Sequence, residues 1–158
     1  MKQTSIVFLI SFLFLIFMSA CKENVYMDWK IMNDNWYAIH QNDSGFTKTS
    51  SGLCYKIIYA GYPLDRKPNK SSQVLVNDKG YLIDMSTFET NTNAKIYLSN
   101  PSPSTIDAWR EMLPKLHTGA HVIFYVPSKI GYDTISTIAT IPPYSVLIYD
   151  LTLLDSQN

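Results

Sequence analysis

Large apolar residues recur at every second position near the end of the chain, and this period of two constrains the fold more than any other feature. The residues are Leu147, Tyr149, Leu151 and Leu153. Because alternate side chains of a β-strand point to the same face, the spacing predicts a strand over Ser145–Leu154. Leu53–Ala60 alternates in the same way, and Val122–Val126 is an apolar run typical of a buried strand.

The middle of the chain indicates further short strands. We expect strands over Gln73–Val76 and Tyr81–Ile83, separated by a turn or bulge at Asn77–Gly80. Phe88 and the run Lys95–Leu98 indicate two more. The sequence therefore predicts a sheet of many short strands rather than a bundle of helices.

Two segments have helical spacing, and the first lies early in the chain. Within Val25–Gln41, apolar residues follow one another at helical intervals, at Val25, Trp29, Met32, Trp36 and Ile39. This stripe predicts a helix that ends before Asn42–Gly45. The helix either packs its stripe on the rest of the domain or serves as a dimerisation arm, and the sequence leaves both interpretations open.

The second helix is shorter and lies in the centre of the chain. Ser104 is a suitable N-cap with Asp107 three residues later. Apolar residues follow at helical spacing, at Ile106, Trp109, Leu113 and Leu116. Because the ring of Pro114 would clash with the carbonyl group of Arg110, we expect the regular helix to end near Leu113. The whole pattern defines an α+β fold with an antiparallel sheet wrapped around a helix.

The first twenty residues have the pattern of a secretory signal. Lys2 precedes the almost wholly apolar run Ile6–Phe17, which is shorter than the roughly 20 residues of a membrane-spanning helix. The small residues before Cys21 resemble the processing site of bacterial lipoproteins, although Met18 stands where leucine is usual. We expect residues 1–20 to be removed and Cys21 to carry a lipid anchor. An ordinary signal peptide or an uncleaved anchor is the alternative.

Composition excludes several classes of protein. Of 158 residues, 46% are hydrophobic and 16% are charged, which is too apolar for a disordered chain. The 13 basic and 13 acidic residues give no net charge, which argues against a nucleic-acid partner. Beyond Cys21 the remaining cysteine is Cys54, so the fold must form without an internal disulfide.

No conventional catalytic group stands out in the sequence. His117 and His121 are four residues apart, but Gly119 lies between them at an expected turn and His40 is distant, so we expect no metal site. The chain contains no Gly-x-Ser-x-Gly motif, phosphate-binding loop or dinucleotide-binding glycine pattern. Cys54 has no nearby histidine, and we expect no cofactor.

Three motifs occur in order along the chain and carry the most specific signal. The first is Ser51–Ile58, which begins Ser-Gly-Leu-Cys-Tyr, and the second is Ile106–Leu113, followed by Gly119. The third joins Val126–Tyr132 to Ile141–Leu151, which begins Ile-Pro-Pro and ends Leu-Ile-Tyr-Asp-Leu. In this order the motifs resemble those of the FKBP-type peptidyl-prolyl cis-trans isomerases.

The resemblance implies a fold. It covers about Lys48–Leu154 and implies an antiparallel half-barrel of five or six strands wrapped around the helix at Ile106–Leu113. We expect a tether and N-terminal helix over residues 21–47, the FKBP-like domain over residues 48–154 and a tail over residues 155–158. In the family, the substrate pocket lies between the helix and the sheet.

The resemblance also implies site residues. The floor of the pocket falls on Trp109, Ile106 stands where the family offers a backbone N–H to the ligand, and Tyr132 stands where it offers a hydroxyl to the peptide carbonyl. The residues with implied catalytic roles are Tyr132, Trp109, Phe88 and Ile106. The residues with implied substrate-binding roles are Ile141, Tyr149, Glu89 and Asp78.

The chain departs from the family pattern at several pocket positions. The family has Tyr where Asp78 stands and Asp where Glu89 stands, so this chain places two acids close together, and such acids repel each other. We expect Asp78 to be solvent-facing or hydrogen-bonded, since an unpaired buried charge is costly. Tyr149 replaces a Phe, and Ala108 and Asp133 replace glycines.

The resemblance implies a peptidyl-prolyl isomerase that assists the folding of exported proteins. Its partners are then proline-containing polypeptides and, through Cys21, a membrane of the bacterial cell envelope, with the outer membrane favoured. One alternative is a catalytically impaired FKBP-like binding or chaperone module, which Asp78 and Asp133 favour. Another is a structural component of an envelope assembly that forms a homodimer through the early helix.

Overall fold

The computed structural model describes residues 26–99, 105–135 and 140–157, in which a helix is followed by four strands, a second helix and two further strands. The elements, in chain order, are α3 (Met27–His40), β1 (Thr47–Lys48), β2 (Cys54–Tyr59), β3 (Gln73–Tyr81), β4 (Thr87–Tyr97), α4 (Asp107–Met112), the 3₁₀ turn η1 (Leu113–Lys115), β5 (His121–Val126), the 3₁₀ turn η2 (Ser128–Ile130) and β6 (Leu147–Gln157).

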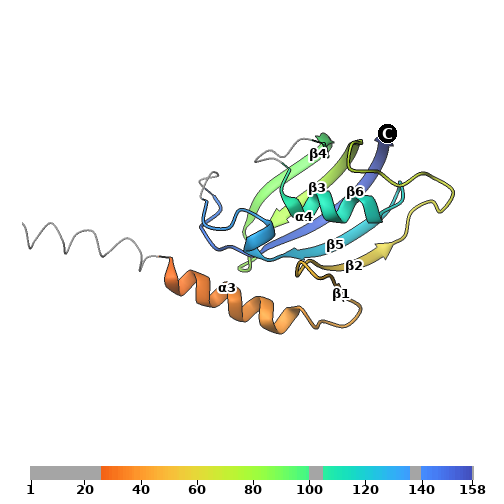
Figure 1. Ribbon diagram of the computed structural model, residues 1–158. Coiled ribbons are helices and arrows are strands. Elements are labelled where there is room, and N and C mark those ends of the chain that lie inside the picture. The colour runs from red at the N-terminus through yellow and green to blue at the C-terminus, as the bar shows by residue number, and fades with distance from the viewer. Residues whose placement is uncertain (1–25, 100–104, 136–139, 158) are drawn as a thin grey trace, which may run out of the picture.

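The six strands form a single antiparallel sheet in the order β1-β2-β5-β6-β3-β4. Figure 1 shows the sheet curving around α4, which lies over one face, while α3 lies beside the edge formed by β1 and β2. The prediction of an α+β fold with an antiparallel sheet around a short helix is confirmed. The order also places β6, the last strand, in the middle of the sheet, where it pairs with both β3 and β5.

The period of two in the last strand sets the core. All four of its alternating residues are buried, Tyr149 at 1% exposure and Leu147, Leu151 and Leu153 at 0%. They pack against the buried face of α4, which supplies Trp109 and Met112. Burial of such side chains contributes roughly 1.5–3 kcal/mol each, so this layer is a main source of stability.

The strands β3 and β4 are longer than the sequence suggested. The expected turn at Asn77–Gly80 is wrong, because β3 runs without interruption from Gln73 to Tyr81. Likewise β4 is one strand of eleven residues rather than two short ones. The polar residues of this stretch stay in strand because β3 is central and pairs on both sides. Register shifts between Val76 and Asp78 show that the bulge alternative was correct.

The central helix begins and ends close to its predicted limits. α4 covers Asp107–Met112, and Ile106, with extended backbone, precedes its first residue. The expected N-cap, Ser104, lies outside the described residues. A 3₁₀ turn containing Pro114 follows the helix, as expected where proline removes a helical hydrogen bond.

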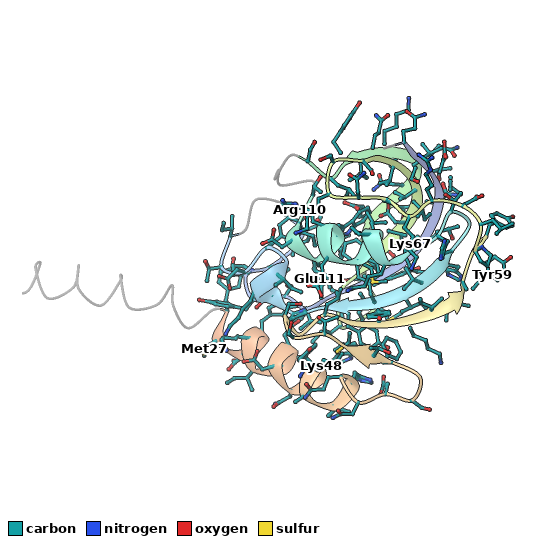
Figure 2. The ribbon with its side chains drawn as sticks, turned by 45° about the vertical axis from the view of Figure 1, so that its right-hand side comes forward. Met27, Lys48, Tyr59, Lys67, Arg110 and Glu111 are labelled. Atoms are coloured by element: carbon teal, nitrogen blue, oxygen red, sulfur yellow. The ribbon has the colours of Figure 1, made fainter. Side chains whose placement is uncertain are left out.

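The last strand extends beyond its predicted end. β6 continues to Gln157, so residues 155–157 of the expected tail are part of the sheet. At the other edge, Cys54 is a free, buried residue of β2, as the strand pattern predicted. Tyr59 ends the same strand and lies on the opposite side of Figure 2 from Met27, the first residue of α3.

The helix α3 packs on the domain through a face that differs from the predicted stripe. Trp29 and Trp36 of that stripe are partly buried, but Met32 and Ile39 are 55% and 69% exposed. The inner face instead combines the two tryptophans with Asn33, which is fully buried. The prediction from helical spacing did not identify this face because it considered apolar residues alone, whereas the polar residue Asn33 makes the central contact.

Hydrogen bonds and ring contacts fix α3 to the sheet side of the domain. The Trp29 indole N–H donates to Ser145 Oγ at 2.9 Å, and the backbone N–H of Val146 donates to Asn33 Oδ1 at 2.8 Å. The Trp36 ring meets the Tyr125 ring of β5 edge-on, with centroids 5.0 Å apart. Lys48, beside α3 in Figure 2, places its ammonium group 5.6 Å from the Tyr37 ring. Among the described residues, no helix is long and apolar enough to span a membrane.

The Asn33 contact predicts a measurable stability effect. Asn33→Ala leaves the buried N–H of Val146 without its acceptor, which should lower the free energy of unfolding by about 1–3 kcal/mol. Asn35→Ala, on the exposed side of the same helix, is the matched control and should change it by less than about 0.5 kcal/mol. Urea unfolding followed by circular dichroism measures both. Equal losses for the two variants would contradict the assigned role of Asn33.

Candidate functional site

Aromatic rings gather where α4 meets the sheet. The Tyr149 ring of β6 stacks on Phe124 of β5 at 5.1 Å and meets Trp109 of α4 edge-on at 5.3 Å. Phe88 of β4 contacts Tyr149 edge-on at 5.6 Å. Such offset and edge-to-face pairs are the favoured geometries of aromatic rings. The structure thus brings together three of the predicted site residues around one ring.

The side chains of this aromatic group differ in how far they are exposed to solvent. Trp109 is 3% exposed and Tyr149 is 1% exposed, whereas Phe88 and Tyr132 are only partly buried. Ile106 and Ile141, at 7% and 2% exposure, belong to the same region of the core. Trp109 and Tyr149 therefore form a covered base, and Phe88 and Tyr132 form the part that a ligand can reach.

Gly80 permits the position of Phe88. A Cβ atom added at Gly80 would lie 2.4 Å from Cζ of the Phe88 ring, much closer than any ordinary contact. Gly80 pairs with Glu89 of β4 and with Tyr149 of β6, so it sits at the centre of the site. The absence of a side chain at this position lets the far end of the Phe88 ring approach the strand closely.

Two acidic side chains meet beside the aromatic group. Asp78 is 3% exposed and lies on the same side of β3 as the core residues Val74 and Val76. Its Oδ2 accepts a weak hydrogen bond of 3.4 Å from Asn91 Nδ2, and its Oδ1 has no hydrogen-bond donor. Burial, together with the hydrogen bond and the charge of Glu89, raises the pKa of Asp78 to about 7.

The expectation that Asp78 is solvent-facing is wrong. The alternation of β3, which continues through the expected turn, directs this side chain to the concave side. The carboxyl group avoids a bare buried charge because burial and Glu89 raise its pKa to about 7, so it holds its own proton below that pH. The alternative expectation of a hydrogen-bonded Asp78 is met at Oδ2 alone, through the contact with Asn91.

Two tyrosine hydroxyls complete the polar part of the site. Burial and the charge of Glu89 raise the pKa of Tyr132 to about 12, while a hydrogen bond with Tyr149 acts in the opposite direction. Burial and the charges of Glu89, Tyr132 and Asp78 raise the pKa of Tyr149 well above its ordinary value. Both phenols thus keep their protons at neutral pH and can donate hydrogen bonds.

The backbone after η2 shows how one departure from the family pattern is accommodated. Asp133, which stands where the family has Gly, adopts a φ of 49°. Aspartate tolerates this left-handed region better than most residues. Its carbonyl oxygen accepts a hydrogen bond of 2.7 Å from the backbone N–H of Tyr144. The loop that carries Tyr132 therefore keeps a sharp turn without glycine.

The histidines lie apart from the aromatic group. His121 Nε2 lies 2.7 Å from Asp150 Oδ1, and His117 Nδ1 lies 2.9 Å from the backbone oxygen of Asp65. His40 Nδ1 pairs with Asp43 Oδ2 at 2.8 Å. Within the described ranges, no group of three histidines, cysteines or carboxylates is placed to hold a metal ion.

A surface hollow lies on the other face of the sheet. It has a volume of about 300 Å³, and its lining includes Lys79, Thr90 and Thr152 together with Asp78 and Asn91. The exposed Lys79 and Thr90 alternate with the residues that point to the concave side. The lining of this hollow contains one aromatic residue, Tyr81, whereas several rings pack together on the concave side, so the concave aromatic group remains the candidate site.

A curved antiparallel sheet around a short helix, with a tryptophan at the base of an aromatic group, defines an FKBP-like class of domain. The family model for FKBP-type peptidyl-prolyl cis-trans isomerase matches residues 64–154. The match covers more than half of the chain, and the chain belongs to this family.

Curated relatives agree with this assignment. FkpA, an FKBP-type peptidyl-prolyl cis-trans isomerase of Escherichia coli K12, is 32% identical over 113 residues, which cover 72% of this chain and 41% of that protein. The outer membrane protein MIP of Legionella longbeachae is 30% identical over 129 residues, covering 82% and 54%. The chain thus spans about half the length, or less, of these relatives.

Solved structures agree on the fold. The crystal structure of FkpA from Escherichia coli matches with a TM-score of 0.78 at 25% identity, covering 99% of this chain and 73% of that chain. A peptidyl-prolyl cis-trans isomerase from Pseudomonas syringae matches with a TM-score of 0.75 at 21% identity, covering 84% and 96%. The second likeness concerns the fold alone.

Sequence reasoning missed Asn91 and the polar role of Tyr149. Asn91 pairs with Asp78 across β3 and β4, a register that the shorter predicted strands could not supply. The substitution of Tyr for Phe at position 149 was the one available signal for a hydroxyl inside the site. The substitution keeps a ring at this position, but a buried phenol also needs a hydrogen-bond partner.

The raised pKa of Asp78 predicts a pH-dependent stability. Since the folded state keeps the Asp78 proton up to about pH 7 and the unfolded state loses it near 3.8, stability contributed by the protonated form is lost as pH rises between these values. Asp78→Asn should therefore be more stable than wild type at pH 8 by about 2 kcal/mol, since partial solvation reduces the roughly 4 kcal/mol of a full shift.

Urea unfolding at pH 4.5, 6 and 8 tests this effect. The difference between Asp78→Asn and wild type should shrink steadily toward pH 4.5. Asp155→Asn, which removes an exposed acid at the end of β6, is the control and should show no such trend. A pH-independent difference for Asp78→Asn would mean that the pKa of Asp78 is not raised in the folded state.

Proposed function

We propose that this chain is a peptidyl-prolyl cis-trans isomerase that binds X-Pro segments against the aromatic group on the concave side. The observation that carries the proposal is the arrangement of Phe88, Trp109 and Tyr149, an apolar base with edge-to-face ring contacts beneath a rim of partly buried rings. Membership in the family supports the same reaction.

The chemistry needs no nucleophile, metal ion or cofactor. The barrier to isomerisation, about 18–20 kcal/mol, is the resonance energy lost when the peptide bond twists. A twisted amide is less polar than a planar one, so a dry aromatic surface binds the twisted form relatively better. Differential binding of this kind lowers the barrier without any covalent step.

The half-buried rim supplies orientation. Tyr132 keeps its proton because its pKa is raised to about 12, so its hydroxyl can donate a hydrogen bond to the substrate carbonyl. The backbone N–H of Ile106 is proposed to bind a second carbonyl, and Phe88 and Ile141 to enclose the proline ring. Trp109, covered at the base, sets the depth to which that ring can enter.

The proposal predicts weak but measurable isomerase activity. Replacement of the family tyrosine by Asp78 removes part of one wall, which costs about 1–3 kcal/mol of transition-state binding. The rate on an X-Pro peptide should then lie roughly 10–100-fold below that of an intact family member. Asp78→Tyr should raise the rate, and Trp109→Ala or Tyr132→Ala should lower it, in a peptide isomerisation assay.

Asp155→Asn serves as the control for activity, because its exposed side chain lies away from the aromatic group. Circular dichroism of each variant separates loss of the site from loss of the fold. If wild type does not accelerate the reaction and Asp78→Tyr restores nothing, the chain is a binding or chaperone module with the same fold instead.

We further propose that the protein works in the bacterial cell envelope and assists exported proteins whose folding is slowed by X-Pro isomerisation. Uncatalysed isomerisation takes tens to hundreds of seconds, which is slow enough to limit folding. Two observations support this setting: the signal-like pattern before Cys21, and the name of the Legionella relative, an outer membrane protein.

Anchoring is proposed to depend on Cys21. Cys21→Ser should abolish incorporation of a labelled fatty acid and move the protein from the membrane fraction to the soluble fraction or leave it unprocessed. Cys54→Ser is the matched control, because Cys54 is buried in β2, and should keep the label. Equal labelling of wild type and Cys21→Ser would contradict a lipid on this residue.

The outer face of α3 is proposed to mediate a homodimer. Met27, labelled in Figure 2, and Ile31 are 49% and 51% exposed, and they lie on the solvent side with Met32 and Ile39. A helix with apolar residues on both faces ordinarily has a partner on each. Sedimentation of the purified chain distinguishes a monomer from the proposed dimer.

A further inference from the structure

We infer that the site favours client segments that carry a lysine or arginine next to the proline, and that Glu89 and Asp78 select this basic residue. The inference rests on the proposed isomerase function and adds a substrate class to it. The two acids are a property of this chain rather than of the family pattern, in which a tyrosine stands at the position of Asp78.

The pair formed by Asp78 and Glu89 contains a buried carboxyl oxygen that receives no hydrogen bond. Asp78 is 97% buried and its Oδ1 has no hydrogen-bond donor, while Asn91 reaches only Oδ2, at 3.4 Å. Glu89 is the more accessible of the two acids, and it pairs with Gly80, the residue against which the Phe88 ring lies. A buried carboxyl oxygen without a donor is costly, so a ligand that supplies a cation is favoured.

No positive charge of the described chain neutralises the pair. Asp78 and the hydroxyl groups of Tyr132 and Tyr149 lie close to one another. The other groups that face them are Glu89 and Asn91 of β4 and Trp109 of α4, and none of these groups carries a positive charge. The ion pairs found among the described residues involve other acids. Lys79, the lysine nearest in sequence, is exposed on the opposite side of β3.

A basic side chain of the ligand would complete the site. Its ammonium or guanidinium group would meet Glu89 first and would draw Asp78 into the ionised form, since a nearby cation favours the charged carboxylate. A proton on Asp78 competes with this cation. The preference for a basic residue should therefore weaken as the pH falls below the range in which Asp78 ionises.

A panel of short proline peptides tests the inference. The residue before the proline is lysine, arginine, norleucine or glutamate, and a second series varies the residue after it. The assay uses the chain without residues 1–20 at pH 8. In one of the two peptide series, kcat/KM should be about 3–10-fold higher with lysine or arginine than with norleucine. In that series, kcat/KM should be lowest with glutamate. At pH 5.5, where Asp78 is protonated, the ratio of lysine to norleucine should fall to about the value that Asp78→Asn shows at pH 8.

Three variants and a binding measurement test whether Glu89 and Asp78 cause the preference for a basic residue. Glu89→Gln should bring the ratio of lysine to norleucine close to one, Asp78→Asn should reduce it by about half or more, and Asp155→Asn should leave it unchanged. Fluorescence anisotropy gives dissociation constants for the same peptides without requiring turnover. If norleucine peptides are turned over and bound as well as lysine peptides, this inference fails while the isomerase proposal stands.

Discussion

The packing of one ring, that of Tyr149, holds the two layers of this domain together. It stacks on Phe124 within the sheet and meets Trp109 of α4 edge-on, so it joins the central strand to the helix that the sheet surrounds. The strand around it places a large apolar side chain at every second position, which gives this face of the sheet a continuous apolar layer. The candidate site is the open margin of that layer, where Phe88 extends it beyond the helix.

The same ring also brings polarity into the site. Its phenol replaces the phenyl group of the family pattern, while Asp78 replaces a family tyrosine on the neighbouring strand. Relative to the family pattern, β6 gains a hydroxyl group, and on β3 a carboxyl group takes the place of a phenol ring. The acid remains buried because β3 lies between two partner strands and cannot turn outward. The raised pKa of Asp78 and the polar ligand recognition that we propose both follow from these two replacements.

The sequence predicted the features that depend on period and on ordered motifs. The alternation at Leu147 to Leu153 and the helix around Trp109 were both correct, and so was the sheet that encloses the helix. It did not predict the contact of Asn33, because amphipathic spacing ignores polar residues that bond to backbone. The sequence also predicted an interruption of this strand at Asn77–Gly80, where local propensity favours a turn. In the structure β3 continues through these residues, because it pairs with a strand on each side. For the same reason the sequence did not predict that Asp78 points to the concave side of the sheet, since this orientation follows from the alternation along an unbroken β3.

The most direct test of the account is exchange spectroscopy by nuclear magnetic resonance on an X-Pro peptide with the isotope-labelled chain. We predict cis–trans exchange peaks of the peptide that appear only when the protein is present. We also predict that the indole N–H signal of Trp109 and the signals of Phe88 and Tyr132 move as the peptide is added. Exchange without movement of these signals, or movement confined to the outer face of the sheet around Lys79 and Thr152, would contradict the assigned site.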